Sequence, residues 1–247
     1  MLLEDSARTI RLDALECQYY RQVISQPWGE DHLAGNQGYL WTGAGCRDLS
    51  AVIPNELVSL HASNLAWMAR HKLASADAAL RVWHCQPDDG GIIADSYMAH
   101  APRVSALNGL KIVWDDGIRT KVRTQREACL PNETGGVLLG YFDLVLGSVF
   151  IVDALAAPPD SLGERTGFIR GVEGLEPAVE EAARRTGQIV RYVGEWHSHP
   201  RGHTPDPSDL DLVLLVHLAS GLDAEGLPAV MLIVGEHDEA WVSGRMA

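Results

Sequence analysis

Short apolar runs alternate with segments of helical periodicity from about Leu110 onward. Apolar runs bounded by turn residues are typical of buried strands, whereas apolar positions spaced three and four apart are typical of helices. Because strands and helices interleave, we expect an α/β fold in which helices flank a central mixed sheet. The predicted strands are 110–114, 135–145, 148–159, 189–196, 228–235 and an edge strand at 240–243, and the predicted helices are 118–129, 175–187 and 207–221.

The first hundred residues have a less regular pattern. Glycine and polar residues dominate 26–48, which we interpret as a long irregular loop. A helix from Asn55 to about Leu73 and a strand at 79–85 are the two elements predicted in this part of the chain.

The pattern changes near residue 105, and the chain has 247 residues, which is enough for one large domain or two small ones. We therefore expect two unequal parts. The first is a smaller, irregular α+β region at 1–104, and the second is a larger domain at 105–247.

The chain is strongly acidic, with 20 Lys and Arg against 33 Asp and Glu and a formal net charge of −13. It would repel phosphate backbones and anionic membrane surfaces, so we expect neither nucleic acid nor membrane as a partner. Apolar runs such as 213–216 and 230–234 are far shorter than the roughly 18 residues of a membrane span. The first residues contain no apolar core of a secretory signal. We therefore expect a soluble, cytoplasmic protein.

The four cysteines, Cys17, Cys46, Cys85 and Cys129, lie far apart and form no C-x-x-C pair. This spacing argues against both a disulfide framework and a cysteine-rich zinc site. A metal site would have to use histidine and carboxylate ligands instead.

The segment GEWHSHPRGHTPDPSDLD, residues 194–211, carries the candidate chemistry. His197 and His199 are two residues apart at the end of a predicted strand, where both imidazoles point to one face. Asp211 could supply a third ligand, because Ser208 and Asp211 share a face of the first turn of the next helix. Three protein ligands leave the fourth position of a tetrahedral zinc open to water, which is typical of a catalytic site. A base is also needed, and carboxylates elsewhere in the domain are the candidates.

These residues resemble the signature of the JAMM (MPN+/JAB) zinc metalloproteases, which release ubiquitin or ubiquitin-like proteins. In this family a glutamate is followed by H-x-H-P, a loop of about seven residues, and S-x-x-D. The resemblance covers roughly 105–247 and implies a JAB/MPN fold with cytidine-deaminase-like layering. It implies His197, His199 and Asp211 as zinc ligands, Glu133 as general acid and base, and Ser208 as hydrogen-bond donor to the substrate oxyanion.

A second resemblance concerns the N-terminal part, in segments such as GAGCRDLSAVIP and LRVWHCQPDDGGI. Bacterial fusion proteins are known in which a ubiquitin-activating-enzyme-like (ThiF-like) domain precedes a JAB domain. These segments are similar to the end of that ThiF-like region. The resemblance implies a conjugating system, in which the N-terminal region would anchor an activating or conjugating enzyme. Gly43-Ala44-Gly45 does not complete a nucleotide-binding G-x-G-x-x-G, so we do not expect adenylation by this chain alone. Cys46 is either a remnant of a thioester-forming cysteine or an incidental thiol.

The sequence thus predicts a zinc-dependent isopeptidase or peptidase that cleaves at the C-terminus of a ubiquitin-like protein. The acidic chain also suits a partner with basic patches. Two alternatives stay open, a non-catalytic MPN-type scaffold and a zinc hydrolase of small peptides.

Four further residues have a structural interpretation. We expect His203 to be an exposed or substrate-facing loop residue, His217 a packed core histidine, Asp209 a solvated neighbour of Asp211, and Trp196 a packing residue facing away from both histidines. The loop TGFIRG, residues 166–171, could border the active-site cleft.

Overall fold

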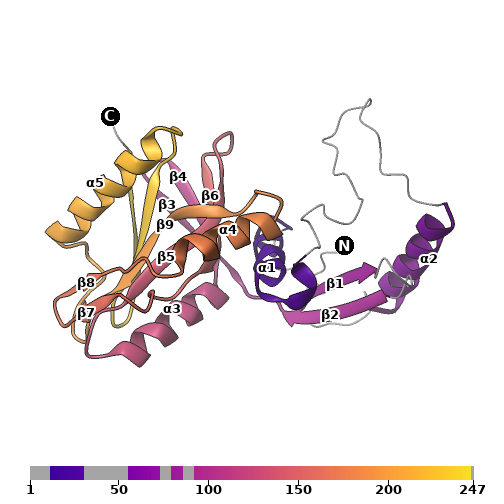
Figure 1. Ribbon diagram of the computed structural model, residues 1–247, viewed down its shortest axis with the longest axis horizontal. Coiled ribbons are helices and arrows are strands. Elements are labelled where there is room, and N and C mark those ends of the chain that lie inside the picture. The colour runs from indigo at the N-terminus through magenta and orange to yellow at the C-terminus, as the bar shows by residue number, and fades with distance from the viewer. Residues whose placement is uncertain (1–11, 31–54, 73–78, 86–91, 246–247) are drawn as a thin grey trace. The chain divides into compact units, whose positions relative to one another are not determined.

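The computed structural model describes residues 12–30, 55–72, 79–85 and 92–245 (Figure 1). They divide into two compact units. The first ends at Ala101 and also takes in Arg184–Gly187, and the second comprises Pro102–Ala183 and Gln188–Ala247. The functional separation of 1–104 from 105–247 stays a prediction.

The first unit contains an antiparallel strand pair and two α-helices. The predicted helix and strand are confirmed as α2 and β1, whereas α1 and β2 were not predicted. Leu15, Tyr19 and Val23 of α1 are buried. Residues 31–48 of the predicted loop, Cys46 among them, lie outside the described residues. The elements are α1 (Leu12–Ser25), the 3-10 helix η1 (Pro27–Gly29), α2 (Asn55–Lys72), β1 (Ala79–Cys85) and β2 (Ile92–Met98).

The second unit is built on a seven-stranded sheet with the order β11-β10-β9-β5-β6-β4-β3. The pairs β10/β9 and β4/β6 are parallel and the other pairs are antiparallel, so the sheet is mixed, as predicted. Its strands are β3 (Pro102–Leu107), β4 (Leu110–Asp115), β5 (Gly135–Asp143), β6 (Ser148–Ala154), β9 (Arg191–Ser198), β10 (Ala229–Val234) and β11 (Glu239–Gly244).

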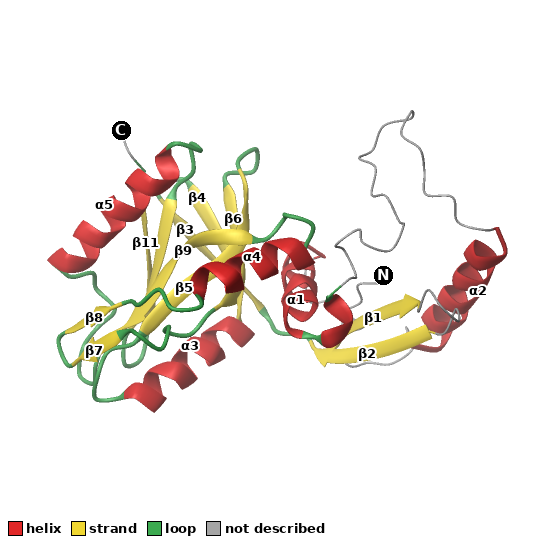
Figure 2. Ribbon diagram, viewed as in Figure 1, coloured by secondary structure: helices red, strands yellow, loops and turns green. Residues whose placement is uncertain are grey.

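Three helices and a small hairpin accompany this sheet (Figure 2). The predicted helices are confirmed, and no end is shifted by more than two residues. Gly187, just beyond α4, has the positive φ of 62° expected of a C-cap glycine. Neither the hairpin nor β3 was predicted. The segment 166–171, expected to be a loop, contains one strand of the hairpin, and the strand predicted at 148–159 ends at Ala154. These elements are α3 (Asp116–Cys129), α4 (Leu175–Arg185), α5 (Asp209–Asp223), β7 (Leu162–Glu164) and β8 (Gly167–Ile169).

Strand β10 shows why helices cover both faces of the sheet. All six of its residues are buried, and successive side chains of a strand point to opposite faces. Alternate residues therefore join two different clusters. Val230, Leu232 and Val234 pack in the cluster that includes Ile118 and Val122 of α3, whereas Ala229, Met231 and Ile233 pack with Leu215 and Ala219 of α5.

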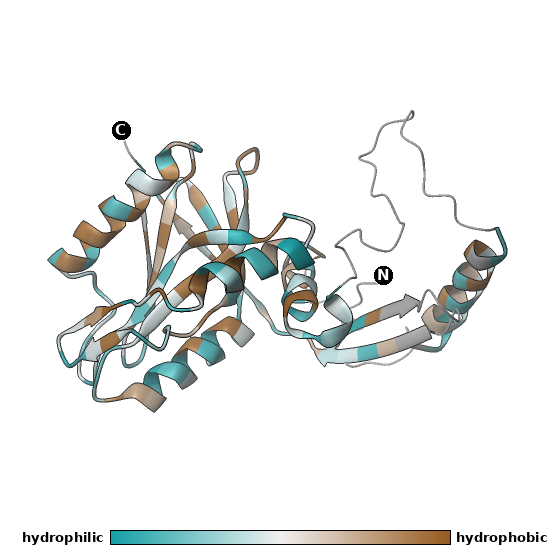
Figure 3. Ribbon diagram, viewed as in Figure 1, coloured by the Kyte–Doolittle hydropathy of each residue, from teal (hydrophilic) through white to brown (hydrophobic). Residues whose placement is uncertain are grey.

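One prediction on α5 is wrong. His217 is exposed, not packed in the core. The cause is that apolar residues run without a break from Leu212 to Val216, so the buried face of this helix cannot be identified from the pattern. Figure 3 shows hydrophobic and hydrophilic residues alternating along α5. Leu210 and Val213, for example, are 72% and 68% exposed. None of the described helices combines the length and the apolarity needed to cross a lipid bilayer.

Candidate metal centre

The pairing of β5 with β9 brings Glu133 to the two histidines. Gly135 pairs with His197 in antiparallel register, so Glu133, two residues earlier, lies level with His199, two residues later. Hydrogen bonds continue this pairing beyond the strands. The Ser198 N–H donates to the carbonyl of Thr134 at 2.7 Å, and the Thr134 N–H donates to Ser198 Oγ at 3.1 Å.

Strand β5 approaches β9 so closely at Gly135 that a side chain would not fit. A Cβ on Gly135 would lie 2.4 Å from the Trp196 carbonyl oxygen and 3.0 Å from His197 Cβ, so only glycine fits there. Trp196 is buried and its Nε1–H donates to the Leu155 carbonyl at 2.8 Å. The predicted packing role of Trp196 is therefore confirmed.

Helix α5 presents Asp211 through its N-terminal cap. Ser208 is the N-cap residue and forms a capping box with Asp211. Asp211 Oδ2 accepts hydrogen bonds from the backbone N–H of Ser208 at 2.7 Å and from its hydroxyl at 2.8 Å. This leaves Oδ1 facing His197, with 3.0 Å between Oδ1 and Nε2. Asp209, the first residue of the same helix, is exposed, as predicted, and is not part of this cluster.

His197, His199 and Asp211 each direct one ligand atom to a common point, and these atoms lie within 4.8 Å of one another. His197 Nε2 is buried and, among the described residues, has no hydrogen-bond partner despite its closeness to Asp211. His199 Nδ1 lies 2.7 Å from the Thr204 carbonyl oxygen. Since a carbonyl can only accept, Nδ1 carries the proton and Nε2, 3.6 Å from Asp211 Oδ2, is available as a ligand. The donor set fits a divalent metal ion.

The electrostatics agree with this arrangement. Burial acts to raise the pKa of Asp211, but the facing imidazoles and the Ser208 N–H outweigh it and hold the pKa well below its usual range. Attraction to Asp211 raises the pKa of His199, against the effect of burial. Burial also raises the pKa of Glu133, and the nearby imidazoles of His199 and His197 oppose this shift. Glu133 is thus half-buried and within range of the charges of all three candidate ligands.

The hairpin β7–β8 supports Glu133 from another direction. The Glu133 N–H donates to the Glu164 carbonyl at 2.8 Å. A Cβ on Gly163 would lie only 2.3 Å from the Glu133 carbonyl oxygen, so the two backbones are in close contact. Beyond the hairpin, Arg170 pairs with the buried Glu195 of β9 at 2.8 Å.

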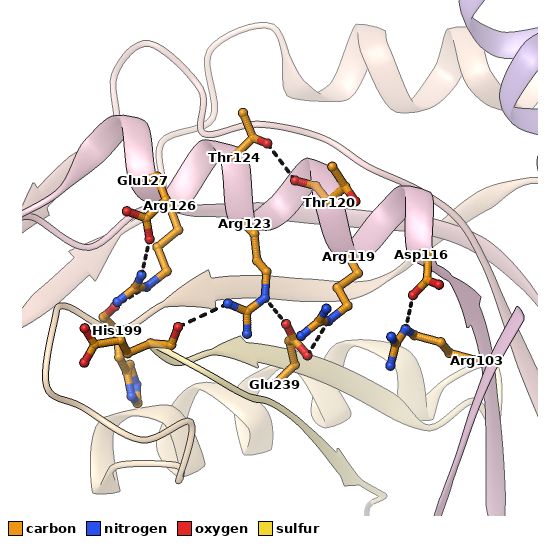
Figure 4. Close-up of polar contacts among 11 residues, drawn as sticks. Arg103, Asp116, Arg119, Thr120, Arg123, Thr124, Arg126, Glu127, His199 and Glu239 are labelled. Atoms are coloured by element: carbon orange, nitrogen blue, oxygen red, sulfur yellow. Dashed lines mark hydrogen bonds and ion pairs between the residues drawn. The ribbon is translucent and has the colours of Figure 1, made fainter. Parts of the chain in front are cut away.

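A residue that the sequence did not reveal supports His199. Arg126 of α3 is 1% exposed, and its Nε–H donates to the His199 carbonyl at 2.8 Å (Figure 4). Its Nη1 pairs with Glu127 at 2.5 Å. Buried arginines need such partners, because an unpaired buried charge is costly. The sequence does contain one indication that Arg126 is buried. Arg126 follows Ile118 and Val122 at intervals of four residues, so it lies on the same face of the helix as these two buried residues.

Several known proteins are similar to parts of this chain. Residues 116–244, just over half of the chain, match the family described as prokaryotic homologs of the JAB domain. A protein of Enterobacter hormaechei named "CD-NTase/cGAS isopeptidase" is 44% identical over 104 residues, which is 42% of this chain and 56% of that protein. A Sinorhizobium fredii protein named "Probable metalloprotease y4qB" is 26% identical over 110 residues, or 44% of this chain and 66% of that protein.

The chain thus spans less than two thirds of the length of either curated relative. Among solved structures, the solution structure of a protein from Desulfitobacterium hafniense is 21% identical to this chain. The likeness covers 51% of this chain and 78% of the other, at a TM-score of 0.35.

Proposed function

Because the chain belongs to the family of prokaryotic homologs of the JAB domain, we propose that it is a zinc-dependent isopeptidase or peptidase. Its substrate is a ubiquitin-like protein, released from a conjugate or trimmed from a precursor at its C-terminal tail. The relative that is 44% identical and named an isopeptidase supports this activity. Its name also makes a conjugate of a CD-NTase/cGAS-like enzyme a second substrate to test.

The observation that carries the proposal is the convergence of three candidate ligands beside the chain segment that carries Glu133. The His197, His199 and Asp211 ligand atoms lie within 4.8 Å of one another, and β-sheet register brings Glu133 level with His199. Two imidazoles and one carboxylate suit zinc. This complete set speaks against a non-catalytic scaffold, in which the ligands would have no purpose.

A bound zinc ion supplies Lewis acidity that makes water ionisable near neutral pH. Glu133 takes up the proton of the attacking water on a carboxylate oxygen and then delivers it to the leaving amine. Its raised pKa suits this exchange, because a base that must also act as an acid works best when its pKa approaches the working pH.

Ser208 has two tasks in this proposal. Its backbone N–H and hydroxyl orient the Asp211 carboxylate, with which both form hydrogen bonds. The same hydroxyl would donate to the oxyanion of the reacting carbonyl. This requires the hydroxyl to turn away from Asp211 Oδ2 when substrate binds.

The N-terminal region, residues 1–104, belongs to the proposal as a partner-binding part. We assign it the anchoring of an activating or conjugating enzyme of the same system, in a bacterial cytoplasm. Deleting residues 1–101 while leaving cleavage of a full conjugate unchanged would remove this assignment.

The test is incubation of wild type and Glu133→Gln with candidate ubiquitin-like proteins that carry C-terminal extensions, with products identified by mass spectrometry. Wild type is expected to cut after the ubiquitin-like tail, and Glu133→Gln is expected to bind zinc without cutting. Equal cleavage by both would show that Glu133 is not the base. Cleavage of short peptides with sparing of every fusion protein would favour the small-peptide hydrolase.

A further inference from the structure

A cavity of about 550 Å³ is lined by segments that neighbour the candidate metal centre along the chain. Three chain segments line it. The first follows α3, the second is the turn between β7 and β8, and the third follows β9. The lining residues are Leu130, Pro131, Arg165, Thr166, Pro200, Arg201 and His203.

Each lining segment is tied to a residue of the proposed mechanism. Pro131 lies two residues before Glu133. Arg165 follows Glu164, whose carbonyl accepts the hydrogen bond from the Glu133 N–H. Pro200 follows His199 directly. The cavity therefore lies next to the segments that carry Glu133 and His199.

The third segment is held in place by backbone contacts. The Gly202 N–H donates to Glu236 Oε2 at 2.8 Å, and the Glu236 N–H donates to the His203 carbonyl at 3.2 Å. His199 Nδ1–H donates to the Thr204 carbonyl at 2.7 Å. The loop that carries Arg201 is thus fixed at both ends before any substrate binds.

The cavity lining is basic although the chain is acidic. Arg165 forms no ion pair within the described part of the chain, and Arg201 has only a distant one, with 3.9 Å between its Nη2 and Glu127 Oε2. Both arginines are exposed. Thr166 adds a hydroxyl, while Leu130, Pro131 and Pro200 supply an apolar surface. Two guanidinium groups that share a cavity with apolar side chains match a carboxylate carried on a short aliphatic stem.

We propose that this cavity binds an acidic side chain, Asp or Glu, of the substrate polypeptide close to the scissile amide. This inference rests on the proposed function, because it assigns the cavity to the substrate of that site. Arg165 and Arg201 bind the carboxylate, and the leucine and proline side chains contact its methylene groups. Since the net charge of −13 repels acidic chains at long range, the two arginines provide local selection between substrates.

Binding to the zinc-loaded full chain carrying Glu133→Gln tests the proposal without turnover. The probes are two fluorescent peptides with amidated C-termini, identical except for a central Glu-Glu or Gln-Gln, and the readout is fluorescence anisotropy. The Glu-Glu peptide is expected to bind about tenfold more tightly, as suits charge-assisted hydrogen bonds. Adding Arg165→Gln and Arg201→Gln is expected to abolish the difference.

A matched control removes two positive charges at the far end of the sheet. Lys111 and Arg191 are exposed and lie at strand ends distant in register from His197, so Lys111→Gln with Arg191→Gln should keep the tenfold preference. Equal binding of the two peptides, no binding of either, or a preference that survives the cavity variant would overturn the proposal.

A third probe separates the two possible sources of a carboxylate. If the Gln-Gln peptide binds tightly only when its C-terminus is free, the cavity holds a terminal carboxylate and the assignment to an acidic side chain is wrong. Failure of the proposed function would appear as absent zinc or absent cleavage. Failure of this inference would appear in peptide binding alone, so the two failures are distinguishable.

Discussion

The guanidinium of Arg126 donates a 2.8 Å hydrogen bond from Nε to the backbone carbonyl of His199. This bond connects α3, which packs on one face of the sheet, to the turn that carries a candidate ligand (Figure 4). On the opposite side of the same residue, the imidazole donates to the Thr204 carbonyl. His199 is therefore fixed through both its backbone and its ring.

Removal of the arginine should weaken metal binding without removing a ligand. We expect Arg126→Gln to lower zinc affinity by about tenfold or more, because groups that orient metal ligands contribute on this scale. Arg126→Lys should recover only part of the loss, since an ammonium lacks the planar fork. Competition with a zinc chelator measures the affinity. Arg119→Gln is the control, because Arg119 lies on the same helix but pairs with Glu239. Loss of zinc affinity in both variants to the same extent would contradict the positioning role.

Asp209 and Asp211 offer a matched pair for testing the third ligand. Both lie in the first turn of α5, but only Asp211 faces the histidines. Loss of a group that only orients a metal ligand reduces zinc affinity by about tenfold or more. Because Asp211 is assigned as a ligand itself, we expect Asp211→Asn to reduce zinc affinity by far more than about tenfold. Asp209→Asn should leave the affinity unchanged. If the chelator titration gives the two variants equal affinities, Asp211 is not a ligand.

The hairpin contact with Glu133 predicts an effect of a single methyl group. Gly163→Ala would place a Cβ 2.3 Å from the Glu133 carbonyl oxygen, and the backbone would have to move. Because small displacements of catalytic groups are costly, kcat should fall by roughly ten- to a hundredfold with zinc content unchanged. Gly167→Ala in the same hairpin has open space around its Cβ and should behave like wild type. Normal kcat in the Gly163 variant would show that the hairpin does not position Glu133.

The pH dependence of cleavage should reflect the pKa of Glu133. Burial raises this pKa above the ordinary value of 4.5. A base acts in its deprotonated form, so kcat/KM should fall as the pH drops through the raised pKa of Glu133. This fall should occur at a higher pH than the titration of an exposed glutamate. Zinc content must be measured at each pH, because protonation of the histidines also releases metal. A rate that declines only in proportion to zinc content would contradict the assignment.

The sequence predicted six of the seven strands of the sheet and the cluster of candidate ligands, because each depends on local patterns. Strand β10 is continuously apolar and the helix end at Cys129 is marked by Pro131. His197, His199 and Asp211 occur within a short segment at strand and helix positions. Their convergence thus follows from the elements around them.

Features that depend on tertiary contacts were not predicted. Helix α1 buries Tyr19 and Gln18 as well as aliphatic residues, so its apolar pattern is weak. Strands β7 and β8 have three residues each, too few for a detectable alternation. Arg126 and the exposed His217 both depend on which face of a helix packs, and on α5 the sequence does not indicate that face.

The metal content of the purified protein tests the central claim most directly. Elemental analysis of wild type and Glu133→Gln should find about one zinc per chain in each, and His197→Ala should contain none. The same samples should show cleavage of the ubiquitin-like fusion by wild type alone. A wild-type protein that neither contains zinc nor binds it when it is added, or a His197→Ala protein with full zinc, would contradict the account.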